Sequence, residues 1–378
     1  MNDEQRHATP PLLRSYGRVA VIHDWLTGMR GGEQVLEGIL GVVPDADLYT
    51  LFHFPGTVST RIELRPIYTS SLQRLAGMVD DYRKLLPLFA RAVREWDFSG
   101  YDLVISSSHA VAKGIDAKGK PHLCYCHTPM RYIWDRFDDY FPRSKPFRRL
   151  AMKFIAWRLR RWDVKTSKGV TEFLANSNFV AERVRRFYGR EAEVVHPFVD
   201  ESFLAAPLPR EREDYHVVVS ALVPYKRVEL AIGAARAGGK RLIVIGSGPL
   251  QEALSRRAAP NVEIAGSVSR ASIIERVGRA RSLILPGVED FGITPLEAMA
   301  LGTPVVALRG GGVIDTVIEG KTGIFFDEPA VESLDRALDE VEARQWDRSI
   351  LRSHAAAFSR ARFHTQFRSA LNRMIDRR

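Results

Sequence analysis

The feature that most constrains the fold is an alternation of short apolar runs with helical spacing, and it occurs twice along the chain. In the first half the apolar runs include "GRVAVIH", "YDLVISSSH", "HLCYC", "TEFLANSN" and "AEVVHPFV". After a break the series restarts with "HVVVSALV", "RLIVIGSG", "VEIAGSV", "SLILPGV", "TPVVAL" and "GIFF". Runs of this length, separated by helical patterns, predict the strands of a parallel sheet with helices on both faces.

A chain of 378 residues fits two domains of ordinary size better than one. The break, "DESFLAAPLPREREDY", is polar, contains two prolines and lacks sustained periodicity, so we interpret it as a linker. We therefore predict two Rossmann-like, doubly wound α/β domains with a ligand-binding cleft between the carboxyl ends of their sheets. The predicted boundaries are a flexible tail at 1–16, a first domain at 17–198, a linker at 199–215, a second domain at 216–357, and a C-terminal helix at 358–378 that could return to the first domain.

The chain is basic, with 55 lysines and arginines against 45 acids and a formal net charge of +10. The excess is local, because residues 143–168 contain ten lysines or arginines and a single acid, Asp163. This pattern predicts an anionic partner such as a phosphate ligand, a nucleic acid or an acidic membrane surface. The same segment contains Trp157 and Trp162, and "DYRKLLPLFARAVREW" has a similar mixture. Such stretches suit a helix on anionic lipid, and they equally suit a solvated helix face above a core stripe.

The sequence before the first predicted strand and the two cysteines lead us to expect a cytoplasmic protein. The segment before the first strand has no long apolar core, so we expect neither a signal peptide nor an anchor there. Cys124 and Cys126 match no common zinc or redox spacing, and we expect buried free thiols. Peripheral attachment to the inner face of the cytoplasmic membrane is compatible with the basic segments.

The stretch "LPGVEDFGITPLEAMALGTPVVA", residues 285–307, places two glutamates around a predicted strand-to-helix turn. Glu297 has a simple structural explanation, because Thr294 suits the N-cap, Pro295 the first helical position and Glu297 the N3 position of a capping box. Glu289 on its own is typical of a solvated loop acid. The helix start is also a candidate anion site, since its free N–H groups and macrodipole attract negative charge.

Two further motifs suit a phosphate ligand. "VPYKRVEL" places Lys226 and Arg227 at a loop-to-helix junction, where adjacent cations can neutralise a diphosphate without a metal. "VIGSGP" places Gly246 and Gly248 directly after a strand, where the backbone can approach a ligand closely. Surface basicity and a tight turn are the respective alternatives.

Taken together and in this order, the motifs resemble the retaining family 4 glycosyltransferases of the two-Rossmann, or GT-B, architecture. The resemblance covers roughly residues 17–370 and rests on "GMRGGEQVL", "YCHTPMRYIWD", "LANSNFVAERV", "VPYKRVELAI", "IGSGP" and "EDFGITPLEAMALGTPVVA". With "HTPMRYIWD", the chain is most similar to bacterial mannosyltransferases that build O-antigen and exopolysaccharide.

The resemblance implies roles for the matching residues. Glu289 would hold hydroxyls of a donor sugar, and Glu297 would hold the ribose hydroxyls of its nucleotide. Lys226 and Arg227 would neutralise the leaving diphosphate, and His127 would lie near the donor sugar. The remaining donor-binding residues would be Gly31, Gly32, Gly246, Gly248, Asp290, Phe291, Gly292, Ile293, Thr294 and Leu296. Arg131 and Asn176 are candidates for the acceptor side of the cleft.

Two positions depart from the family pattern. Many members carry arginine where this chain has Ala221, so Arg227 is the candidate for the missing charge. Asp315 stands where glutamate is usual. No D-x-D motif occurs in a plausible place, and we therefore expect no cofactor and no divalent metal.

The resemblance implies a hexosyltransferase that moves mannose from GDP-mannose to a lipid-linked or oligosaccharide acceptor in bacterial surface polysaccharide synthesis. The resemblance implies retention of configuration by a front-face route. Alternatives are a UDP-sugar donor, a sugar-nucleotide epimerase of the same architecture, a non-catalytic sugar-nucleotide sensor and a nucleic-acid-binding protein. Nucleic acid is the least favoured partner, because the charge is local and no binding motif accompanies it.

Overall fold

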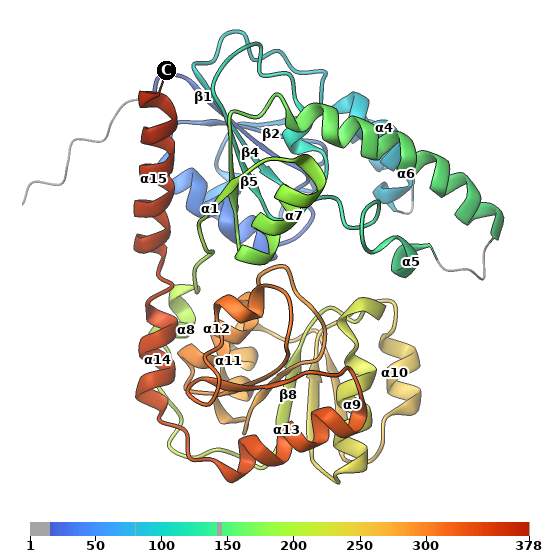
Figure 1. The fold of residues 1–378 in the computed structure, drawn as a ribbon, viewed down its shortest axis with the longest axis vertical. Helices are drawn as coiled ribbons and strands as arrows, with labels where there is room; N and C mark the ends of the chain where they lie inside the picture. The colour runs from blue at the N-terminus through green and yellow to red at the C-terminus, as the bar shows by residue number, and fades with distance from the viewer. Residues whose placement is uncertain (1–15, 80, 142–145, 378) are drawn as a thin grey trace, which may run out of the picture.

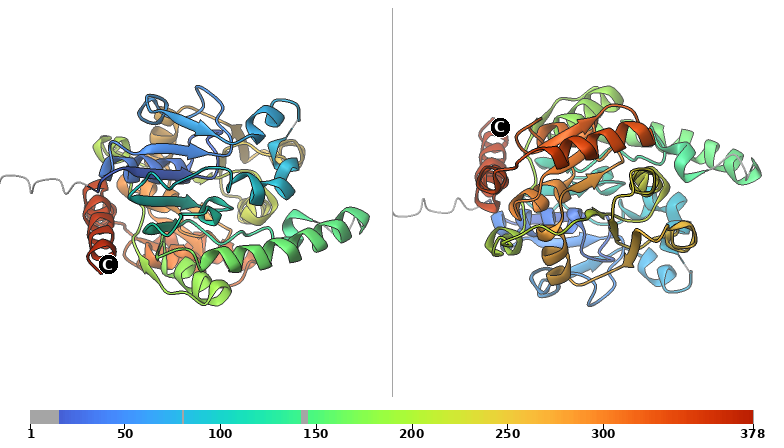
Figure 2. Two further views of the ribbon diagram at one scale, coloured as in Figure 1. Left: turned by 90° about the horizontal axis from the view of Figure 1, so that it is seen from above. Right: turned by 90° about the horizontal axis from the view of Figure 1, so that it is seen from below.

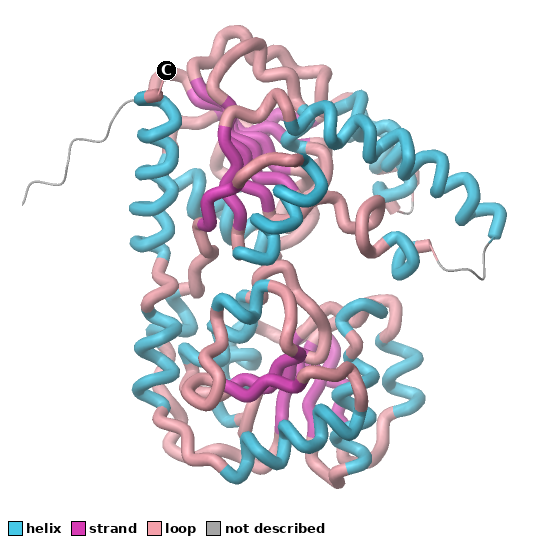
Figure 3. Tube along the Cα trace, viewed as in Figure 1, coloured by secondary structure: helices cyan, strands magenta, loops and turns pink. Residues whose placement is uncertain are grey.

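Two α/β units are stacked along the long axis of the molecule in the computed structural model (Figure 1). The structure describes residues 16–79, 81–141 and 146–377. The predicted tail at 1–16 therefore lies outside the described residues apart from Tyr16, as does the start of the basic segment at 143–168. Each unit contains one parallel sheet with helices around it (Figure 3). The prediction of two Rossmann-like domains is confirmed.

The first sheet has the strand order β3-β2-β1-β4-β5-β6-β7, and all neighbouring strands are parallel. Strands β1 and β5 are buried along their whole length, which explains why they appear as continuous apolar runs. The strands are β1 (Val19–His23), β2 (Asp47–Thr50), β3 (Ile67–Thr69), β4 (Leu103–Ser108), β5 (His122–Cys126), β6 (Glu172–Ala175) and β7 (Ala192–Val194).

The second sheet has the order β10-β9-β8-β11-β12-β13 and is also parallel. Both orders reverse beside the strand that begins the unit, β1 or β8, and open α/β sheets bind ligands at the carboxyl ends of strands beside such a reversal. The strands are β8 (His216–Val219), β9 (Leu242–Ile245), β10 (Val262–Gly266), β11 (Leu283–Leu285), β12 (Val305–Leu308) and β13 (Gly323–Phe326).

Helices cover both faces of each sheet. Those that precede the second sheet are α1 (Gly31–Val42), α2 (Thr60–Glu63), α3 (Leu72–Ala76), η1 (Tyr82–Leu85), α4 (Leu86–Ala92), η2 (Ala112–Gly114), α5 (Phe137–Tyr140), α6 (Pro146–Ser167), α7 (Asn178–Tyr188) and α8 (Glu201–Ala205). The later ones are η3 (Pro224–Lys226), α9 (Val228–Ala237), α10 (Gln251–Arg257), α11 (Arg270–Arg279), α12 (Ile293–Ala300), η4 (Gly312–Asp315), α13 (Val331–Ala343), α14 (Arg348–Ala356) and α15 (Arg360–Asp376).

Each sheet separates two apolar cores. Along β1, Val19 and Val21 belong to one core, whereas Ile22 belongs to the core on the opposite face, as the two-residue period of a strand requires. Cys124 and Cys126 of β5 are buried and free, so the expectation of buried free thiols is confirmed.

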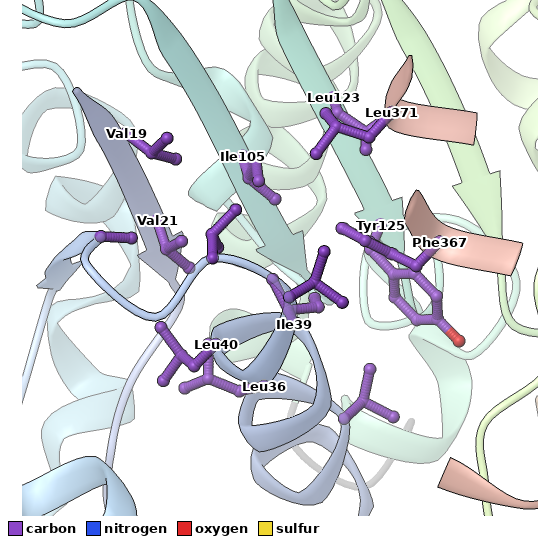
Figure 4. Close-up of a cluster of buried hydrophobic side chains, with 14 of the residues drawn as sticks. Val19, Val21, Leu36, Ile39, Leu40, Ile105, Leu123, Tyr125, Phe367 and Leu371 are labelled. Carbon is purple, nitrogen blue, oxygen red and sulfur yellow. The ribbon is translucent and has the colours of Figure 1, made fainter. Parts of the chain in front are cut away.

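The last helix, α15, leaves the second unit and packs against the first (Figure 1). Phe363, Phe367 and Leu371 enter the core of the first unit, which also contains Ile39 of α1 and Tyr125 of β5. Figure 4 shows Phe367 beside Tyr125 and Leu371 beside Leu123, and the rings of Phe367 and Tyr125 are 6.4 Å apart between centroids. The end of the chain therefore completes the core of the domain that the start of the chain builds.

The segment predicted as a linker, 199–215, is not an open connection. It contains α8, and the side chains of Val199 and Phe203 are buried in a core of the second unit. The sequence conceals this helix because so short an element buries too few side chains to produce a visible period.

We expect Phe367→Ala to lower the free energy of unfolding of the first unit by about 3–5 kcal/mol, because it leaves a cavity in a closed core. Ser369→Ala, on the exposed side of the same helix, is the control and should change it by less than about 0.5 kcal/mol. Urea unfolding with hydrogen exchange at the amides of β1 and β5 measures the effect. Equal stability of the two variants would show that α15 is dispensable for this core.

Candidate active site

Glu289 and Lys226 meet at the carboxyl edge of the second sheet. Glu289 lies between β11 and α12, Lys226 ends η3, and the Lys226 ammonium donates to Oε1 of Glu289. Both side chains are largely buried. A side chain at Gly287 would place its Cβ 2.7 Å from the Tyr225 carbonyl oxygen and 2.9 Å from Cα of Lys226. Glycine at 287 therefore allows the two loops to pack closely enough for this ion pair.

The helix that carries Glu297 begins earlier than the sequence predicts. Helix α12 starts at Ile293, and its N-cap is Gly292, which has a φ of 86° and makes no side-chain cap. Thr294 is therefore the second helical residue and Glu297 the fifth, so the predicted capping box is wrong. The physical reason is that glycine adopts the left-handed conformation at little cost, which lets the chain enter the helix two residues sooner.

Glu297 has an unusual electrostatic environment. Burial raises the pKa of its carboxyl to about 7, against the opposing influence of Arg270, and Asp200 adds to the rise. Arg270 is itself paired with Asp200 at 2.6 Å. Near neutral pH the Glu297 carboxyl is therefore balanced between its acid and carboxylate forms, and both can hydrogen-bond a hydroxyl group.

The glycine loop of the first unit approaches this helix start. Gly31 is the first residue of α1, and a Cβ there would lie 3.1 Å from Cδ1 of Ile293, the first residue of α12. A Cβ on Gly32 would lie 3.6 Å from the ring of His23. The amino-terminal ends of two helices from different units thus come together, and both favour negative charge.

His127 follows β5 and is buried at the carboxyl edge of the first sheet. Its Nε2 hydrogen-bonds Oγ of Ser107 at 2.8 Å, and its carbonyl accepts a hydrogen bond from Nδ2 of Asn176 at 2.9 Å. Burial, with smaller effects from His109 and His23, lowers the pKa of His127 well below the ordinary value. The ring is therefore neutral. Asn176, a candidate acceptor residue, uses its amide to fix the backbone of His127.

Polar residues that were not predicted from the sequence lie behind His127. The hydroxyl of Ser107 also contacts Nδ1 of His23 at 3.0 Å, and the ring of His109 lies 6.2 Å from that of His127. These three side chains end or follow β1 and β4, in "VIHDW" and "ISSSH". Polar residues at the ends of buried strands are the signal that would have identified them.

Asp290 joins the two units. Its carboxylate is bound by Nη1 of Arg183 at 2.7 Å, by Nε of Arg131 at 3.1 Å and by Oγ1 of Thr128 at 3.2 Å, all from the first unit. The backbone oxygen of Asp290 accepts a hydrogen bond from Oγ of Ser177 at 2.5 Å. Asp290, predicted to bind the donor, and Arg131, a candidate for the acceptor side of the cleft, are thus bound to each other.

Asp315 forms a second contact between the two units. Its carboxylate accepts hydrogen bonds from the backbone N–H of Asn178 at 2.7 Å and from Nδ2 of the same residue at 3.1 Å. It also contacts Nε2 of His196 at 3.1 Å. The shorter acid at this position is accommodated because the start of α7 lies directly against η4.

Other predicted donor residues are explained largely by packing. A Cβ on Gly246 would lie 1.9 Å from the carbonyl oxygen of Ser220, and one on Gly248 would lie 2.5 Å from that of Leu222. These glycines allow the loops after β8 and β9 to touch. The side chains of Phe291 and Leu296 are buried in a core of the second unit.

The predicted cations differ in their surroundings. Arg227 has a φ of 52° at the N-cap of α9, and among the described residues its guanidinium has no ion-pair partner. Ala221 is exposed and leaves its position without charge. Within the part of the chain that the structure describes, no group of histidine, cysteine, aspartate and glutamate side chains is arranged to hold a metal ion.

We expect Arg183→Met to weaken the interaction between the two units at Asp290 by about 3 kcal/mol, because the substitution removes a buried partner of the Asp290 carboxylate. The variant should show faster hydrogen exchange over residues 286–292 and a larger radius of gyration by X-ray scattering. Arg185→Met is the matched control, because Arg185 lies on the same helix in an exposed pair with Glu182. Indistinguishable behaviour of the two variants would contradict a bridging role for Asp290.

The raised pKa of Glu297 predicts a pH-dependent stability. The folded state favours the protonated carboxyl of Glu297. Its contribution to the free energy of unfolding is therefore fully present below the ordinary pKa of 4.5 and is lost as the pH rises through about 7. The free energy of unfolding of Glu297→Gln should rise relative to that of the wild type by a few kcal/mol between about pH 5 and pH 8. Urea unfolding at both pH values measures this difference, with the exposed Glu229→Gln on α9 as control. A constant difference would refute the prediction.

The comparison with family models divides the chain at the same place as the fold. Residues 57–203 match the model described as Glycosyltransferase Family 4, and residues 200–359 match the model for Glycosyl transferases group 1. The two matches meet at α8, the segment between the sheets.

Curated relatives match over part of their length. A GDP-mannose-dependent alpha-(1-6)-phosphatidylinositol monomannoside mannosyltransferase of Mycolicibacterium smegmatis is 32% identical over 199 residues, which is 44% of this chain and 52% of the relative. An alpha-1,3/1,6-mannosyltransferase of Dictyostelium discoideum is 45% identical over 56 residues, which is 15% of this chain and 13% of that one. The chain thus spans about half the length of the first relative and less of the second.

Solved structures match over nearly the whole chain. Anabaena HepE in complex with UDP-glucose gives a TM-score of 0.67 at 16% identity, covering 94% of this chain and 99% of that one. Sucrose-phosphate synthase from Thermosynechococcus elongatus gives 0.68 at 15% identity, covering 96% and 100%. With this fold and with both halves matched by glycosyltransferase models, the chain belongs to the family 4 glycosyltransferases of the GT-B architecture.

Proposed function

We propose that the protein is a retaining hexosyltransferase that moves mannose from GDP-mannose to a hydroxyl of a lipid-linked or oligosaccharide acceptor in bacterial surface polysaccharide synthesis. The observation that carries the proposal is the Lys226–Glu289 pair beside the meeting helix starts of α1 and α12. This arrangement offers a diphosphate-binding group and a sugar-binding group in contact with each other. The mannosyltransferase relatives support mannose as the transferred sugar.

Donor binding would exchange the partners of this pair. Before binding, Lys226 and Glu289 neutralise each other in a largely buried position. A donor would bring two negatively charged phosphates to Lys226 and hydroxyl donors to Glu289, so that both groups keep a hydrogen-bonded partner. Arg227 and the two helix starts supply further positive potential for the diphosphate.

The proposed reaction needs no protein nucleophile. The bond between the anomeric carbon and the phosphate oxygen breaks while the acceptor oxygen bonds to the same face of that carbon. The acceptor's proton passes to the leaving phosphate oxygen, so retention and proton balance are both satisfied. Preorganised dipoles and cations stabilise the charge that develops on the diphosphate, an effect worth several kcal/mol in such sites. We expect no divalent ion to be required.

His127 would orient the donor sugar. Its Nε2 is occupied by Ser107, and its low pKa keeps the imidazole neutral. The other ring nitrogen, Nδ1, has no hydrogen-bond partner among the described residues and could bond a sugar hydroxyl. A neutral ring suits this role, because an imidazolium would compete with Lys226 for the diphosphate.

A UDP-sugar is the second candidate donor, because HepE, which has the same fold, is seen with UDP-glucose. Guanine and uracil would be distinguished by loops of the second unit. The acceptor is proposed from the family resemblance alone. We propose that the reaction occurs at the cytoplasmic face of the membrane, where lipid-linked acceptors are available. No helix among the described residues has the length and apolar character needed to cross a bilayer.

A thermal-shift screen of GDP-, UDP-, ADP- and dTDP-sugars tests the donor. We expect GDP-mannose at about a hundred times its Kd to stabilise the protein by about 2.7 kcal/mol, whereas stabilisation by a UDP-sugar alone would overturn the mannose assignment.

Glu289→Ala should lower the transfer rate by about a hundredfold or more without loss of folding. Glu229→Ala, on an exposed part of α9, is the control. A wild-type rate in Glu289→Ala would refute the site.

A further inference from the structure

Helix α6 exposes a row of large apolar side chains. Phe147 is 89% exposed, Leu150 69%, Phe154 60% and Trp157 52%. Spacings of three, four and three residues place all four on one side of the helix. The helix extends outward from the body of the first unit (Figures 1 and 2). A contiguous exposed apolar surface of this kind marks an interaction site.

Basic residues continue the same side of the helix toward its carboxyl end. Arg158, Arg161 and Lys165 are exposed and follow at helical spacing. The Arg158 guanidinium lies 6.0 Å from the ring of Phe154, and that of Arg161 lies 5.1 Å from the ring of Trp157. The cations and aromatic rings therefore form one surface. We call it the α6 face and define it as Phe147, Leu150, Phe154, Trp157, Arg158, Arg161 and Lys165.

The basic end of the α6 face continues into a hollow at the amino-terminal edge of the first sheet, before β5 and β6. The cations that line this hollow are Arg94, Lys118, Lys120, Lys165 and Lys168. Its one acidic residue, Asp116, is neutralised by Lys118 at 3.3 Å. The positive surface thus extends beyond the helix.

The opposite side of α6 is fixed to the domain. Lys113 and Asp163 form a buried ion pair of 2.6 Å, and Nε1 of Trp134 donates to the same aspartate at 2.8 Å. Near the outer end, Nη1 of Arg149 donates to the carbonyl of Phe141 at 2.6 Å. A partner bound to the α6 face would therefore hold the whole first unit in one orientation.

The outer end of α6 lies close to the candidate active site. Phe141, which binds Arg149, directly follows α5, and Tyr140 of α5 stacks on Tyr225 with ring centroids 6.2 Å apart. Tyr225 adjoins Lys226, the partner of Glu289. A surface docked on α6 would thus lie beside one entrance of the interdomain site.

We propose that the α6 face docks on an anionic lipid bilayer. Aromatic and aliphatic side chains on one side of a helix, with cations beside them, enter the interfacial layer and attract acidic headgroups. A second copy of this chain fits less well, because two basic faces would repel each other. The consequence for catalysis, delivery of a lipid-linked acceptor to the adjacent site, rests on the proposed function.

Vesicle sedimentation with the full chain tests the proposal. Vesicles of phosphatidylglycerol and phosphatidylcholine in equal parts should bind the protein at low salt, and vesicles of phosphatidylcholine alone should bind it much less. The double variant Phe154→Ser/Trp157→Ser should lower the partition coefficient about tenfold or more. Arg158→Gln and Arg161→Gln should each lower it about fivefold. Vesicles should also shift the tryptophan emission of the wild type to the blue, and Trp157→Phe should reduce this shift.

Leu64→Ser and Arg256→Gln are the matched controls, since both residues are exposed and lie outside the α6 face. Absence of vesicle binding by the wild type, or unchanged binding by the double variant, would overturn the proposal. So would a wild-type dimer that the double variant dissociates without any lipid binding. Donor turnover with a short water-soluble acceptor should be unaffected by the α6 variants. If the wild-type protein binds vesicles but shows no donor turnover, the proposed function is refuted and the proposed docking surface is still supported.

Discussion

The carboxylate of Asp290 is held across the junction of the two units by Arg183 and Arg131, and the geometry of the candidate site depends on this contact. Removing one partner of a buried ion pair commonly costs several kcal/mol, so the loop before α12 is anchored to the first unit. Glu289 is the preceding residue, and Gly292, the N-cap of α12, follows two positions later. Both the proposed sugar-binding carboxylate and the helix start are therefore positioned by residues of another domain.

Three charged side chains near the candidate site, those of Lys226, Glu289 and Asp315, already have partners within the protein. Lys226 is bound to Glu289, and Asp315 is bound to His196 and Asn178. A buried charge without a partner is costly, so these pairs stabilise the charged side chains in the folded protein. In the proposed function Lys226 would bind the diphosphate and Glu289 the sugar hydroxyls of the donor. Glycine at 287 makes the first pair possible, because a side chain there would overlap the backbone at Tyr225.

The resemblance to family 4 glycosyltransferases, not local patterns alone, assigned the loop glycines 31 and 32, Lys226 and Glu289 to one site. The structure brings Gly31 close to Ile293 and Lys226 into contact with Glu289. The capping box at Thr294 was wrong, because a left-handed glycine starts the helix earlier than side-chain preference alone suggests. Asp290 and Asn176 were placed against a ligand, but they bind protein groups that lie 49 or more residues away in the sequence.

The sequence by itself determined the two series of strands and helices, the order of the motifs and the presence of the glutamates, cations and glycines at strand ends. These features arise from periodicity and backbone preference, which act between near neighbours in the chain. Only the tertiary structure decided that α15 completes the first core, that Asp290 joins the domains and that α6 presents its apolar and basic side outward. Each of these depends on which distant side chains share a buried volume, and no local pattern encodes that proximity.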